Sequence, residues 1–128
     1  MEIRSSSPSS CRRAASYAEA VGFADLHFVG VDTPKQPDGS YDLTHLFGVV
    51  QLAPLLTRPA AVAVKSTVPV GTALRVAELL HELAPTGDLV EVAWNPEFLR
   101  KSFAIEDTLR PDRLVLGPGR SRAETVMW

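Results

Sequence analysis

Residues 65–72, KSTVPVGT, gather polar groups at a point where a strand should give way to a helix. They follow the apolar run AAVAV and precede the amphipathic stretch ALRVAELLHELA. A plain connection needs a turn and a helix cap, which the proline, the glycine and Thr72 as N-cap can supply. Ser66 and Thr67 have no obvious structural duty. Their hydroxyls and backbone amides suit a ligand's ribose or phosphate, or a water, beside a helix N-terminus.

A second candidate is the segment NPEFL at residues 95–99. Glu97 is expected in the first turn of a helix, where a carboxylate complements the helix dipole and Asn95 serves as the cap. The same carboxylate could also act as a general base or position a water in a cleft. Spacing alone favours the first interpretation and leaves the second open.

Other familiar site motifs do not occur in this sequence. The three histidines lack the spacing of metal ligands, so no metal site is expected. The chain contains neither G-x-G-x-x-G nor a Walker loop, and its single cysteine, Cys11, excludes an internal disulfide.

The candidate residues must be positioned by an alternation of strands and helices. Hydrophobic runs predict strands at residues 25–31, 59–64, 88–94 and 112–117. Helical periodicity predicts helices at residues 14–24, 43–56, 73–84 and 96–107, the second capped by Asp42 or Ser40. Residues 1–15 are mostly small and polar and are expected to form a disordered head.

This alternation predicts βαβ units and a parallel sheet. In open α/β sheets, ligands bind outside the carboxyl ends of the strands. The polar segments DTP, KSTVPVGT and WNPEF follow three successive predicted strands. The sequence therefore predicts a ligand site at that edge of the sheet.

Composition narrows the class of protein. The 128 residues carry 13 basic and 15 acidic side chains, a formal charge of −2 that gives no indication of a nucleic-acid or anionic-membrane partner. The apolar runs are too short for a membrane span or a signal peptide. The cytoplasm is the default expectation.

The segments VDTP, DLT, KSTVPVGT and WNPEFLRKSFAIEDTLRPDRLVLG together resemble the UDP-glucose/GDP-mannose dehydrogenase family, most closely its bacterial UDP-glucose 6-dehydrogenases. The likeness runs from Ala20 to Gly117. It implies an α/β, Rossmann-like fold with a partial doubly wound parallel sheet and alternating helices. Residues 16–128 would form the second half of an NAD-binding domain. It also implies oxidation of UDP-glucose to UDP-glucuronate with two NAD, so the expected partner is a UDP-sugar.

The resemblance assigns a role to each matched position. Thr67 and Glu97 would be catalytic, Thr67 beside the nicotinamide and the catalytic water, Glu97 assisting hydrolysis of a thioester. The cofactor would be bound by Thr33, Pro34, Ser66 and Thr67, and the UDP-sugar by Glu97, Phe98 and Leu99. Three positions depart from the family pattern: Asp32 stands where glycine is usual, and Lys101 and Ser102 replace glutamate and glycine.

Two further expectations concern the chain by itself. It lacks the family's dinucleotide fingerprint and catalytic cysteine motif, so as an isolated fragment, such as a truncated gene product, it should be inactive. Residues 25–31 would form an apolar sheet edge open to self-association. The alternatives are a non-catalytic α/β binding module and a receiver-like regulator, and the WNPEF end of the third strand argues against the receiver.

Overall fold

The computed structural model describes residues 2–4, 11–96, 99 and 102–110. Its centre is a parallel sheet of three strands, β3 (Leu26–Val29), β4 (Ala60–Val64) and β5 (Val90–Trp94), in the order β3-β4-β5. The register aligns Val29 with Val64 and Val64 with Trp94, so all three strands end at one edge. The predicted α/β, Rossmann-like fold is confirmed for this part of the chain.

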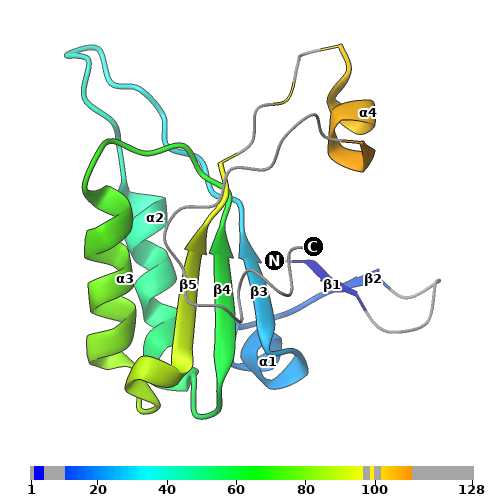
Figure 1. Ribbon diagram of the computed structural model, residues 1–128, viewed down its shortest axis with the longest axis vertical. Coiled ribbons are helices and arrows are strands. Elements are labelled where there is room, and N and C mark those ends of the chain that lie inside the picture. The colour runs from blue at the N-terminus through cyan, green and yellow to red at the C-terminus, as the bar shows by residue number, and fades with distance from the viewer. Residues whose placement is uncertain (1, 5–10, 97–98, 100–101, 111–128) are drawn as a thin grey trace.

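Helices follow the strands as the sequence predicts. Their bounds are α1 (Tyr17–Phe23), α2 (Thr44–Gly48), the 3-10 helix η1 (Val49–Leu55), α3 (Thr72–Leu83), the 3-10 helix η2 (Gly87–Leu89) and α4 (Ala104–Leu109). Helix α3 packs beside η1, which continues α2. Figure 1 shows these helices next to the strands, and α4 set apart beyond the carboxyl ends of the strands.

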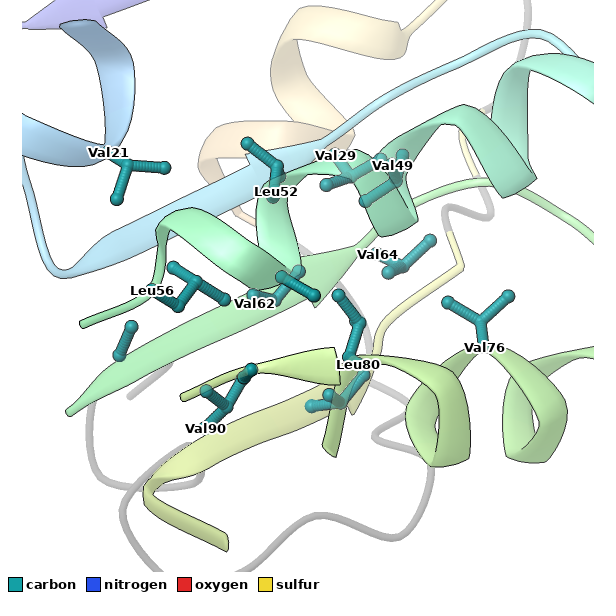
Figure 2. Packing of buried hydrophobic residues seen from close by; sticks show 14 of the residues in the cluster. Val21, Val29, Val49, Leu52, Leu56, Val62, Val64, Val76, Leu80 and Val90 are labelled. Atoms are coloured by element: carbon teal, nitrogen blue, oxygen red, sulfur yellow. The ribbon is translucent and has the colours of Figure 1, made fainter. Parts of the chain in front are cut away.

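The core lies between the sheet and the helices on one face. All five residues of β4 are buried, and its valines alternate with alanines. Val62 and Val64 belong to the apolar cluster that also contains Leu80 of α3 and Leu52 of η1. Figure 2 shows these side chains meeting between the strands and the helices. The period-two pattern of β4 therefore places its larger side chains on the helix-covered face.

Two helices differ in detail from the sequence prediction. The helix expected at 43–56 is α-helical only to Gly48 and continues as η1, which contains Pro54, a residue without an amide hydrogen for helical bonding. Thr72 is the first residue of α3 rather than its cap. Gly71 takes the cap position with φ of 87°, a left-handed conformation that favours glycine.

The last described helix is shorter than expected. Sequence periodicity predicts residues 96–107, whereas α4 covers Ala104–Leu109 with Phe103 at its cap position. Residues 97–98 and 100–101 of the prediction lie outside the described residues, as does the strand expected at 112–117. The cap role expected of Asn95 concerns residues 97–98, so it stays a prediction.

The N-terminal segment also differs from expectation. Strands β1 (Glu2–Arg4) and β2 (Cys11–Arg13) pair in antiparallel fashion within the stretch predicted to be disordered. The prediction rested on side chains too small and polar to form a core. Strand pairing uses backbone groups, which every residue but proline offers in full.

Strand β3 is an edge of the parallel sheet as described, since it pairs with β4 alone in that sheet. Phe28 is 56% exposed on it. These facts leave self-association through residues 25–31 a prediction. None of the helices in the described ranges has the length and hydropathy needed to span a bilayer.

We expect truncation of Leu80 to destabilise the fold strongly. Leu80 is fully buried, so Leu80→Ala should lower the free energy of unfolding by about 2–5 kcal/mol, from lost burial plus a cavity. Leu74 on the same helix is 66% exposed, and Leu74→Ala should change stability by less than about 0.5 kcal/mol. Urea unfolding of both variants is the measurement, and equal losses would contradict this placement of the core.

Stability should also fall with acidification because of His27. Burial lowers the pKa of His27; the nearby Asp25 carboxylate opposes the shift and the Arg58 guanidinium adds to it. Its Nε2 is buried without a hydrogen-bond partner. The unfolded chain therefore takes up this proton at a higher pH than the folded protein does. The stabilisation is complete above the ordinary pKa of 6.5 and is lost as the pH falls below it.

The measurement is the slope of unfolding free energy against pH between pH 7 and 5. His27→Gln should flatten the slope, whatever its effect on stability at a single pH. His45→Gln, at an exposed position of α2, should leave the slope unchanged. An unchanged slope in His27→Gln would show that another group causes the pH dependence.

Candidate functional site

The polar segments predicted from the sequence meet at the carboxyl edge of the sheet. Residues 30–33 follow β3, residues 65–67 follow β4 and Asn95 follows β5. Parallel pairing continues briefly past the strands, because Lys65 N donates to Val29 O at 2.8 Å and Asn95 N donates to Val64 O at 2.9 Å. The three segments are thus held at one level above the sheet, where Figure 1 shows all three strands ending.

Ser66 joins these segments. Its hydroxyl donates to Val31 O at 2.7 Å and accepts from Val31 N at 3.1 Å. Its backbone carbonyl accepts from Trp94 Nε1 at 2.9 Å. Ser66 is buried, so one residue ties the end of β4 to both neighbouring strands. Sequence reasoning gave Ser66 no structural duty, and that interpretation is wrong, since the partners of its hydroxyl lie 35 residues away along the chain.

The two threonines of the edge differ in what their hydroxyls do. Thr33 Oγ1 donates to Thr67 O at 2.8 Å and so fixes the loop after β3 against the loop after β4. The exposed Thr67 makes no side-chain hydrogen bond within the described residues, which leaves its hydroxyl free for a ligand or a water. The carbonyl of Pro34 accepts from Asp42 N at 2.9 Å, so Pro34 shapes its loop through the backbone.

Lys65 and Asn95 form a polar contact between the ends of β4 and β5. Lys65 Nζ donates to Asn95 Oδ1 at 2.7 Å, and Asn95 is only 3% exposed. The partner of this ammonium is thus a neutral amide. Sequence reasoning did not select Lys65 as a site residue, although its place beside Ser66 and Thr67 was a signal that could have done so.

These groups surround an open pocket of about 360 Å³, lined by residues 30–33 and 65–67. Thr33, Ser66 and Thr67 of the predicted set meet here, together with Asp32 and Lys65. Leu99 is described and partly exposed but does not line this pocket. Glu97 and Phe98 lie outside the described residues. Within the described ranges, no group of three or more metal-ligating side chains comes together.

Comparison with known proteins assigns the chain to a family. Residues 6–127 match the model of the UDP-glucose/GDP-mannose dehydrogenase family, NAD binding domain. A UDP-glucose 6-dehydrogenase of Pseudomonas aeruginosa is 44% identical over 113 residues, which are 85% of this chain and 25% of that protein. One from Rhizobium meliloti is 43% identical over 112 residues, 84% of this chain and 25% of that protein.

Solved structures give the same answer. The chain is similar to a ternary complex of GDP-mannose dehydrogenase from Pseudomonas aeruginosa, with a TM-score of 0.80, 29% identity and coverage of 89% of this chain and 28% of that one. A UDP-glucose dehydrogenase from the hyperthermophilic archaeon Pyrobaculum islandicum gives a TM-score of 0.76 at 41% identity, covering 89% of this chain and 27% of that one.

The fold is that of a dinucleotide-binding α/β protein. The chain belongs to the UDP-glucose/GDP-mannose dehydrogenase family, and the matched part is its NAD-binding domain. It spans about a quarter of the length of the relatives it matches. The pocket fits a part of NAD, because it lies outside the carboxyl ends of parallel strands and offers a free hydroxyl and backbone groups.

We expect Ser66→Ala to cost stability because it removes two bonds at once. Val31 would lose both the acceptor of its amide and the donor to its carbonyl, in a partly buried position. The expected loss is about 1–3 kcal/mol of unfolding free energy. Ser40→Ala is the control, because the Ser40 hydroxyl bonds only the exposed Asp38. A loss no larger than that of Ser40→Ala would mean that Ser66 does not join the strand ends energetically.

Proposed function

We propose that this chain forms part of the cofactor crevice of an NAD-dependent UDP-glucose 6-dehydrogenase. Such an enzyme oxidises the primary alcohol of UDP-glucose in two stages to the carboxylate of UDP-glucuronate. Support comes from the relatives of that name and from one feature of the pocket. Three hydroxyls meet there, and among the described residues those of Thr33 and Ser66 have protein partners whereas that of Thr67 has none.

The division among the three hydroxyls suggests a role for each residue. Ser66 and Thr33 position the loops that face the cofactor, and with Pro34 they contribute backbone groups to its binding. Thr67, at the rim, contacts the cofactor and holds the water that takes part in the second stage. A hydroxyl suits this role because it can donate one hydrogen bond and accept others.

NAD, when bound, supplies the acceptor for the hydride that leaves the alcohol carbon. The chain's own task is then to orient the substrate and to move protons. We assign to Glu97 the role of proton acceptor in hydrolysis of the thioester. Contacts with the UDP-sugar are assigned to Glu97, Phe98 and Leu99. These assignments rest on the family motif NPEFL, which stands at residues 95–99 of this sequence.

The proposal is tested by NAD binding to the 128-residue chain, measured by calorimetry. Thr67→Val keeps the shape of the side chain but removes the hydroxyl, and it should weaken NAD binding by roughly threefold to tenfold, the worth of one hydrogen bond. Thr57→Val, at an exposed position before β4, is the matched control and should bind as the parent does.

Three results would contradict the proposal. They are failure of NAD to bind the parent chain, binding of NAD by Thr67→Val as tight as by the parent, and binding by Thr57→Val as weak as by Thr67→Val. Binding of an unrelated ligand with no affinity for NAD or UDP-glucose would favour a non-catalytic binding module instead.

A further inference from the structure

Two opposite charges line the strand-end pocket without pairing. Asp32 is exposed in the loop after β3, and Lys65 is partly buried directly after β4. Both residues are described, and the structure records no ion pair between them. Oppositely charged side chains that share a pocket but do not neutralise one another are available to a ligand that lies between them.

Lys65 is held by a neutral group. Among the described residues, its side chain has one hydrogen-bond partner, the amide oxygen of the buried Asn95, at 2.7 Å. An ammonium has three donors, so this bond fixes its position and leaves two donors free. The amide is neutral, and no carboxylate of the described residues forms an ion pair with this ammonium.

Asp32 brings the complementary chemistry. A carboxylate offers only acceptors, and an ammonium offers only donors. A phosphate in the pocket would be attracted by Lys65 and repelled by Asp32, and a cationic group would meet the reverse. A hydroxyl satisfies both, since it donates to the carboxylate and accepts from the ammonium. Neighbouring hydroxyls on one ring can do this together.

We propose that Asp32 and Lys65 form a subsite for two neighbouring hydroxyls of a sugar ring, with Asn95 positioning the ammonium. This inference rests on the proposed function, because a dinucleotide and a UDP-sugar both carry such hydroxyls, on a ribose or on the glucosyl ring. The free hydroxyl of Thr67 stands at the rim of the same pocket and can supply a third contact.

The test is calorimetry on the full chain with three ligands: NAD, an NAD analogue whose nicotinamide ribose lacks both hydroxyls, and UDP-glucose. Asp32→Asn removes the charge while keeping the shape. Asn95→Asp gives Lys65 a carboxylate partner of the same shape and so neutralises the ammonium in place. Asp38→Asn is the control, because Asp38 follows the pocket residues 30–33 along the chain, does not line the pocket and accepts hydrogen bonds from Ser40. Thermal melting of each variant shows that it is folded, and Lys65→Gln replaces Asn95→Asp if that variant is not.

We expect Asp32→Asn and Asn95→Asp each to weaken binding of the ligand whose ring hydroxyls occupy the subsite. The expected loss is roughly tenfold or more, which corresponds to one hydrogen bond to a charged group. Asp38→Asn should bind as the parent does. If the two variants lose affinity for NAD but not for the analogue whose nicotinamide ribose lacks both hydroxyls, the subsite binds the nicotinamide ribose. Equal loss with both NAD forms assigns it to the adenine ribose, and loss only with UDP-glucose assigns it to a sugar of that ligand.

Other results would overturn the subsite. If NAD and UDP-glucose bind the parent but neither affinity changes in Asp32→Asn and Asn95→Asp, the subsite is wrong and the proposed function stands. Tighter binding in Asp32→Asn would show that an anionic group occupies the pocket and would also overturn the inference. If the parent binds neither ligand, both the subsite and the proposed function fail.

Discussion

The arrangement of this molecule depends on the parallel pairing of β4 with a strand on each side. The register aligns Val29, Val64 and Trp94, so the three strands end together. The hydrogen bonds of Lys65 N and Asn95 N carry the pairing past the last strand residues. Parallel strands run in one direction, and the loops that leave their carboxyl ends therefore gather at one edge. A shift of register would separate the groups of the pocket.

The same strand also decides where the core forms. Alternate side chains of β4 lie on opposite faces: Val62 and Val64, with Ala60, belong to the cluster formed with η1 and α3, and the alternation places Ala61 and Ala63 on the other face. Burial on the helix side supplies the main driving force for folding. Val31 and Val68 of the strand-end loops pack against this cluster, whereas the polar residues of these loops do not belong to it. The pocket can therefore carry polar groups at little cost to the core.

The edge of the sheet divides its polar groups between structure and ligand. The hydroxyls of Ser66 and Thr33 are used to join loops, and the amide of Asn95 holds an ammonium. A rigid frame made in this way keeps the remaining groups, Thr67, Asp32 and Lys65, in defined places. Such fixed placement reduces the entropy that a ligand's binding would otherwise cost.

The sequence by itself determined the order of elements and the edge where polar residues would meet. Strong periodicity in β4 and α3 and the apolar character of β3 and β5 made these elements predictable, since burial and local geometry act within a few residues. The motifs KSTVPVGT and NPEFL also indicated the family that the comparisons show. Helix ends were less predictable, because the turn at Gly71 and the 3-10 segment around Pro54 depend on how the chain packs.

Only the tertiary structure decided which polar group does what. Ser66 and Thr67 are neighbours with similar side chains, and nothing local distinguishes a hydroxyl that is bonded to Val31 from one that is free. The contact of Lys65 with Asn95 joins residues 30 positions apart. The physical reason is that hydrogen-bond partners are set by proximity in space. Strand pairing brings together segments that are far apart along the chain, and nothing in the local sequence shows which segments these are.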